Sequence, residues 1–170
     1  MDILVVVDMQ KDFISGALGT KEAQAILPRV AEKIVQAKKA GKTIVFTRDT
    51  HHENYLDTQE GKNLPVPHCI ENTDGWQIDP ALDTAGAMIF DKPSFGSEAL
   101  VRYLKSLPDL QSAEFVGLCT DICVITNVLS TKCALPELPI SVDSACCAGV
   151  TPQSHENALS AMRTCQINIL

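Results

Sequence analysis

The ten residues Glu114-Phe115-Val116-Gly117-Leu118-Cys119-Thr120-Asp121-Ile122-Cys123 join an apolar run to the start of a helical pattern. The run 114–118 has the length and composition of a buried strand, and 121–135 follows it at once as a helix. A strand that leads directly into a helix is the repeating unit of α/β proteins. The stretch therefore predicts an α/β fold in which Cys123 lies in the first turn of a helix.

The same alternation extends over the rest of the chain. Expected strands are 3–7, 43–47, 87–90, 140–142 and 167–170, and expected helices are 22–40 and 152–163. Near-continuous apolar strands are typical of parallel sheets that are buried on both faces. We therefore expect a doubly wound, Rossmann-like, mostly parallel sheet with helices on both faces, in a single domain over residues 1–170.

The composition restricts the class of partner. The 170 residues are 45% hydrophobic and 21% charged, with a formal net charge of −7, and they contain no basic stripe. Nucleic acid and membranes are therefore poor partners, and a small molecule is favoured. Residues 1–8 lack the basic start and long apolar run of a secretory signal, so a cytoplasmic location is expected.

Polar side chains follow the expected strands at one edge of the sheet. They are Asp8, Asp49 with His51, Lys92, and the turn that contains Cys123. Ligands of open parallel sheets bind at the carboxyl ends of the strands, so these groups are expected to converge on one site.

Cys123 is the candidate nucleophile at this edge. A helix N-terminus favours a thiolate and offers N–H groups to an oxyanion, and the charge of Lys92 is expected to lower the thiol pKa. Asp8 is placed to accept and return the proton. Each has a simpler interpretation: a buried apolar cysteine, an aspartate that caps a turn, and a surface lysine.

Residues 50–81 show no clear periodicity and hold three of the four histidines. A loop this long is usually functional, so we interpret it as a metal and substrate loop. The candidate ligands are two carboxylates and two imidazoles, which suit a catalytic divalent metal, with zinc favoured and iron or manganese as alternatives: Asp49, His51, Glu60 and His68. The fourth histidine, His155, is expected to be a polar surface residue.

Three motifs together resemble the isochorismatase-like cysteine hydrolases, and within them the nicotinamidases. They are Val7-Asp8-Met9-Gln10-Lys11-Asp12-Phe13, Phe90-Asp91-Lys92-Pro93-Ser94-Phe95 and Gly117-Leu118-Cys119-Thr120-Asp121-Ile122-Cys123-Val124. The resemblance implies a catalytic set of Asp8, Lys92 and Cys123. It also implies a cis peptide between Leu118 and Cys119, which aims the N–H groups of Cys119 and Cys123 at the oxyanion.

The nicotinamidase subgroup is distinguished by its metal. Asp49 and His51 match its Asp-x-His pair, His68 matches its downstream histidine, and Glu60 fits a variant of the middle ligand. The resemblance implies hydrolysis of nicotinamide to nicotinate and ammonia through a thioester on Cys123. Phe13 and Phe95 would clamp the ring, although Leu64 and Pro65 stand where many nicotinamidases carry an aromatic residue. Because relatives are often dimers or larger, a homo-oligomer is expected.

Three alternatives remain open. The first is a related hydrolase that acts on another small amide or on an enol ether. The second is a phospho-acceptor receiver domain, which is disfavoured because Lys92 follows the third strand and Asp8 has no acidic neighbour. The third is a metal-binding or redox protein without turnover, which is disfavoured because the seven cysteines include no Cys-x-x-Cys pair.

Overall fold

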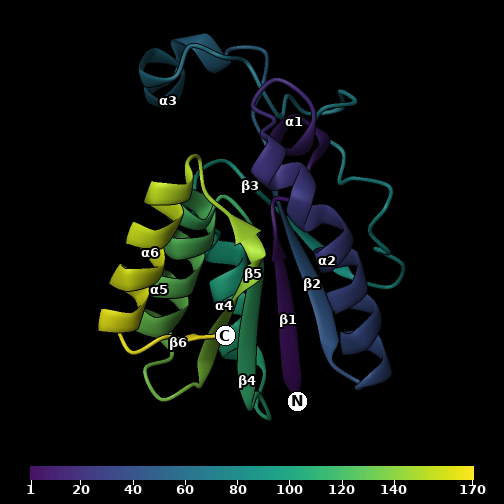
Figure 1. The fold of residues 1–170 in the computed structure, drawn as a ribbon, viewed down its shortest axis with the longest axis vertical. Helices are drawn as coiled ribbons and strands as arrows, with labels where there is room; N and C mark the ends of the chain where they lie inside the picture. Colours follow the sequence, from purple (N-terminus) through teal and green to yellow (C-terminus); the bar gives the residue numbers. More distant parts are fainter.

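The computed structural model describes all 170 residues as a single α/β domain (Figure 1). Its strands are β1 (Asp2–Val7), β2 (Thr43–Asp49), β3 (Met88–Lys92), β4 (Ser112–Leu118), β5 (Ile140–Ala148) and β6 (Asn168–Ile169). Its helices are α1 (Lys11–Ile14), α2 (Lys21–Lys39), α3 (Gln59–Asn63), α4 (Glu98–Ser106), α5 (Ile125–Ala134) and α6 (Pro152–Thr164), with a 3₁₀ turn at Tyr55–Asp57 and a π-helical turn at Thr120–Val124. No helix has the length and apolar character to cross a bilayer.

The six strands form one sheet in the order β3-β2-β1-β4-β5-β6. Every pair of neighbouring strands is parallel, so the expectation of a mostly parallel sheet is confirmed and strengthened. The chain winds outward from β1 to one edge and then from β4 to the other. The direction of winding therefore reverses between β1 and β4, which is where doubly wound proteins bind their ligands.

The apolar run of β1 is buried on both sides because helices cover both faces. Ile3, Val5 and Val7 pack in one core with residues of α4, α5 and α6, whereas Leu4 and Val6 pack in a second core with residues of α2. Each fully buried aliphatic side chain contributes about 1.5–3 kcal/mol of transfer free energy. Two-sided burial is the reason that β1 shows a continuous apolar run in place of alternation.

The helix boundaries follow local signals. Thr20 caps the start of α2 by accepting a hydrogen bond from the Ala23 N–H, and Gly41, with φ of 72°, follows the helix end. Thr151 begins α6 in a capping box with Ser154. These ends lie within one residue of those predicted from the sequence.

The longest discrepancy is α4, a helix of nine residues where the sequence pattern predicted no element. The strand β5 is also longer than expected, because it continues from Ile140 to Ala148 and not only to Val142. Its pairing with β4 is irregular between Phe115 and Gly117. At Gly117 φ is 119°, and a Cβ would lie 2.1 Å from the Val7 carbonyl oxygen. Only glycine fits there, and it allows β4 to approach β1 closely just before the turn that carries Cys123.

The long segment 50–81 is more ordered than expected. It contains the 3₁₀ turn and α3, and Figure 1 shows α3 standing out beyond the end of the sheet. Its return path is fixed by backbone bonds to the start of the chain, from Lys11 N–H to Gln77 and from Asp12 N–H to Gly75. The segment 50–81 is therefore a loop that is fixed to the rest of the domain by backbone hydrogen bonds.

Candidate active site

The predicted residues meet at the carboxyl ends of four neighbouring strands. Asp8 follows β1, Asp49 ends β2, Lys92 ends β3 and Cys123 lies in the π-helical turn after β4. All four are buried, with at most 5% of each residue exposed. The site thus occupies the point where the winding reverses, as the strand-end pattern indicates.

Lys92 is the hub of this cluster. Its Nζ lies 2.7 Å from Asp8 Oδ2, 3.3 Å from Asp49 Oδ1 and 3.4 Å from Cys123 Sγ, and it donates to the Ser94 carbonyl at 2.9 Å. Burial acts to lower the pKa of Lys92, but the carboxylates hold it above its ordinary value. The side chain is therefore an ammonium ion that faces the sulfur.

Asp8 is held in an unusual backbone conformation, with φ of 48°. Its Oδ1 accepts a hydrogen bond of 2.6 Å from Thr47 Oγ1, while its contact with Lys92 is an ion pair without the alignment of a hydrogen bond. Burial raises the pKa of Asp8, and Lys92 opposes that rise. A carboxylate with a raised pKa suits a group that must take up and release a proton.

The pKa of Cys123 reflects a balance between burial and the neighbouring charges. Burial raises the pKa of the thiol well above its ordinary value, the negative charge of Asp8 adds to the rise, and Lys92 only offsets part of it. Lys92 lowers the thiol pKa, as expected from the sequence, but burial outweighs its charge. A buried thiol of this kind needs a base in contact at the moment of attack.

The helix that carries Cys123 begins at Thr120 with a π-helical turn in place of the expected α-helical one. The Val124 N–H bonds back five residues to the Cys119 carbonyl at 3.1 Å. Such turns are rare and often occur at functional sites. The peptide bond between Leu118 and Cys119 is cis, as the family resemblance implies. The Cys119 N–H donates to no backbone acceptor, so it is available to a ligand.

A second cluster lies beside the first and forms a candidate metal site. His51 Nε2 lies 2.9 Å from Asp49 Oδ2 and 3.6 Å from Glu60 Oε1, and His68 Nε2 lies 3.6 and 3.7 Å from the same two oxygens. All four ligand atoms lie within 4.8 Å of one another. Tetrahedral ligands about 2.1 Å from a zinc ion would be roughly 3.4 Å apart, so the spacing fits a divalent cation.

The orientation of the two imidazoles supports the same fit. His51 Nε2 is buried without a hydrogen-bond partner, although an oxygen lies close by. The other ring nitrogen of His68 contacts the Val66 carbonyl at 2.8 Å, which places a proton on Nδ1 and leaves the lone pair of Nε2 facing the cluster. A metal ion would use both lone pairs.

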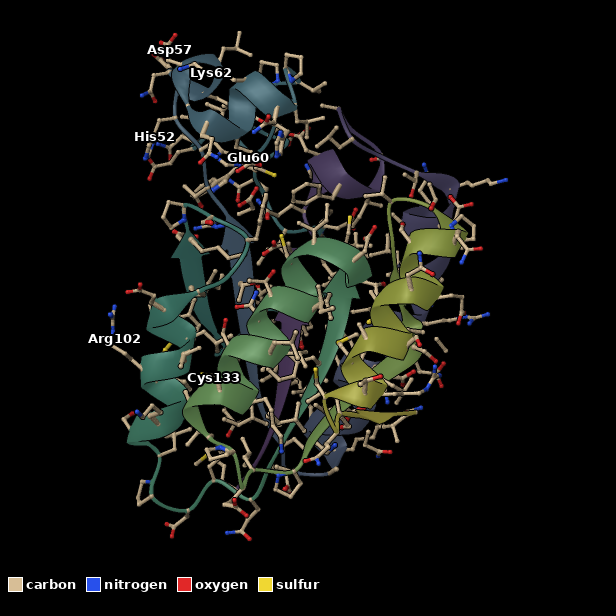
Figure 2. The ribbon with its side chains drawn as sticks, turned by 90° about the vertical axis from the view of Figure 1, so that its left-hand side faces the viewer. His52, Asp57, Glu60, Lys62, Arg102 and Cys133 are labelled. Atoms are coloured by element: carbon tan, nitrogen blue, oxygen red, sulfur yellow. The ribbon has the colours of Figure 1, made fainter.

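Glu60 comes from α3, within the segment 50–81. Figure 2 shows it on the part of α3 that faces the sheet, whereas Asp57 and Lys62 lie further out. Tyr55 forms a wall behind the histidines, with its ring centroid 4.8 Å from His51 and 5.0 Å from His68. The segment 50–81 thus completes the candidate metal site.

A cavity of about 390 Å³ opens beside both clusters. Cys123 and Cys119 lie on one side of it, Asp49, Glu60 and His68 line another part, and the rings of Phe13 and Phe95 also face it. No lysine or arginine is among the residues that line it. The cavity therefore offers apolar walls, a thiol and the candidate metal ligands to one small molecule.

The model of the isochorismatase domain matches residues 2–170. The chain belongs to the isochorismatase family. The pyrazinamidase of Pyrococcus horikoshii, solved in complex with zinc, is 30% identical, with a TM-score of 0.87 and coverage of 99% of this chain and 98% of that one. The nicotinamidase/pyrazinamidase of Mycobacterium tuberculosis is 26% identical over 193 residues, covering 100% and 98%. The nicotinamidase of Acinetobacter baylyi is 27% identical over 162 residues, covering 76% and 73%.

Two buried amides hold this isochorismatase-family site together, and sequence reasoning missed both. Gln10 accepts from the Asp49 N–H at 2.7 Å and donates to the Asp49 carbonyl at 2.8 Å, which fixes the end of β2. Asn127 donates to the Cys123 and Phe95 carbonyls at 2.8 and 3.1 Å. Gln10 lies inside a quoted motif, but no local signal distinguishes Asn127 from an ordinary polar residue of α5.

Proposed function

We propose that the chain is a metal-dependent cysteine amidohydrolase that converts nicotinamide and water to nicotinate and ammonia. The observation that carries this proposal is the contact of one ammonium, Lys92 Nζ, with Asp8, Asp49 and Cys123 Sγ at a cavity that is also lined by the candidate metal ligands. The full-length similarity to nicotinamidases supports the choice of substrate.

The first half of the reaction uses the buried thiol. Asp8 accepts the proton of Cys123 as the sulfur attacks the carboxamide carbon, and Lys92 stabilises the negative charge that passes between them. The Cys119 and Cys123 N–H groups would stabilise the carbonyl oxygen as it becomes an oxyanion. Asp8 then gives the proton to the departing amine, so that ammonia leaves and a thioester remains on Cys123.

The second half hydrolyses the thioester. Asp8, again ionised, accepts a proton from a water molecule as the water oxygen attacks the thioester carbon. The carbon–sulfur bond then breaks, the acid leaves, and Asp8 returns the proton to Cys123 Sγ. A cation held by Asp49, His51, Glu60 and His68 would act as a Lewis acid that binds and polarises a lone-pair donor of the substrate or water. Phe13 and Phe95 line the cavity on which a flat ring would pack.

The lining of the cavity favours a neutral substrate. No lysine or arginine lines it, whereas Asp49 and Glu60 do. A substrate with its own carboxylate would therefore find no ammonium or guanidinium partner among the lining side chains. This disfavours an acidic enol ether as the substrate. A related hydrolase for another small amide, or for a neutral enol ether, remains the alternative.

Ammonia release from a panel of amides tests the proposal. With zinc-loaded protein, nicotinamide and pyrazinamide are expected to turn over, while non-aromatic amides are expected to react at least about tenfold more slowly, because only a ring can use the apolar walls. If non-aromatic amides alone are hydrolysed, the nicotinamidase assignment fails and the alternative replaces it.

The candidate metal site gives a separate prediction. His51→Ala and Glu60→Gln are expected to lower zinc affinity by at least about tenfold, measured by metal analysis after dialysis against a chelator. His52→Ala is the matched control, because His52 is the next residue, is exposed and lies outside the cluster. Unchanged zinc affinity in His51→Ala would contradict the assignment of the ligands.

A further inference from the structure

The turn that carries Cys123 makes a side-chain contact with a histidine of α6. Thr120, the first residue of the π-helical turn, is fully buried, and its hydroxyl contacts His155 Nδ1 at 2.8 Å. This is the one side-chain hydrogen bond of Thr120. His155 lies in the first turn of α6 and is half-buried. The expectation that it is a surface residue is therefore wrong, because the first turn of α6 packs against the π-helical turn that carries Cys123.

The local structure brings His155 to this position. Gly149 lies against it so closely that a Cβ on Gly149 would be 2.8 Å from the His155 backbone nitrogen. The His155 N–H donates to the Thr151 carbonyl at 3.0 Å, within the capped first turn of α6. A second contact joins the π-helical turn to the segment just before α6, because the carboxylate of Asp121 accepts from the Val150 N–H at 3.2 Å.

We propose that His155 is a positioning residue for the reaction, acting through the Thr120 hydroxyl on the backbone between Cys119 and Cys123. His155 does not line the cavity, so it does not touch the substrate. By anchoring Thr120, it keeps the Cys119 N–H and the Cys123 sulfur in register with Asp8 and Lys92. The inference rests on the proposed function, because it assigns His155 to the attack of that sulfur.

The variants His155→Ala and Thr120→Val remove the contact from its two ends. Each is expected to lower kcat by about 10- to 100-fold with KM within about twofold, because a nucleophile displaced by a fraction of an ångström reacts more slowly from an unchanged binding cavity. The double variant is expected to be no slower than the worse single variant, since both remove one interaction. His155→Asn, which keeps a nitrogen near the Nδ1 position, is expected to recover part of kcat.

Gln153→Ala is the matched control, because Gln153 lies on the same turn of α6, is exposed, and makes its one side-chain hydrogen bond to Asn157. Thermal melting and zinc content identify any variant that fails to fold, and the remaining variants then decide. Equal kcat in wild type and folded His155→Ala, or effects of the two single variants that multiply, would overturn the proposal.

Failure of the proposed function gives a different result. In that case the wild type leaves nicotinamide intact, and the same variants are compared by the rate at which iodoacetamide alkylates Cys123, measured by peptide mass spectrometry. Slower alkylation in His155→Ala and Thr120→Val, but not in Gln153→Ala, would support the positioning role on its own. Equal alkylation rates in all of them would overturn it.

Discussion

Replacing Cys123 by alanine is expected to reduce nicotinamide hydrolysis to the background of the assay. The sulfur of Cys123 contacts Lys92 at 3.4 Å, whereas Cys119, the other cysteine that lines the cavity, makes no hydrogen bond to Lys92. Loss of a covalent nucleophile typically costs at least about 10⁴-fold in kcat. Zinc content should be unchanged, because Cys123 is not among the four clustered ligands.

Cys147→Ala is the control that separates chemistry from packing. Cys147 lies in the same hydrophobic core as Cys123 and is similarly buried, with 4% exposed against 5%. Both variants remove one buried sulfur, so both are expected to lower the melting temperature by comparable amounts. Only Cys123→Ala should lose turnover. Retained turnover in that variant would remove the proposed mechanism.

Asp8→Asn is expected to lower kcat by about 10²- to 10⁴-fold, the usual contribution of general acid–base catalysis. The amide has the shape of the carboxylate but cannot accept the thiol proton, and the buried Cys123 thiol does not ionise without a base because burial raises its pKa. KM should change little, since Asp8 does not line the cavity. The measurement is steady-state kinetics with nicotinamide.

Asp91→Asn is the control for the change of charge. Asp91 precedes Lys92 on β3, is exposed and pairs with Arg48, so it has the same charge without access to the sulfur. Its kcat should stay within about twofold of the wild type. A fall in Asp91→Asn as large as that in Asp8→Asn would mean that net charge near Lys92, and not proton transfer, governs the rate.

The parts of the site that lie at strand ends could be predicted from the sequence. Each of Asp8, Asp49 and Lys92 directly follows or ends an apolar run, and parallel strands bring such ends to one edge. The position of Cys123 at the start of a helix could also be predicted, because residues 117–123 join a strand to a helix without a linker. These signals are local in the sequence, and the parallel sheet brings the residues that carry them close together.

Features that depend on contacts distant in sequence could not be predicted. Gln10 fixes Asp49 across 39 residues, and Thr120 meets His155 across 35. The protonation of Cys123 depends on how completely the fold excludes water, which spacing does not reveal. The ordering of 50–81 depends on backbone bonds to residues near Lys11, so the segment lacks the periodicity that predicts structure.

The central claim is that the carboxamide carbon is transferred to Cys123 Sγ. Rapid quenching in acid during turnover of nicotinamide, followed by proteolysis and mass spectrometry, tests it most directly. A nicotinoyl group is expected on the peptide that contains Cys123, and it should be absent from Cys123→Ala. Continued ammonia release with that peptide unmodified at every quench time, or an acyl group on a different cysteine, would contradict the claim.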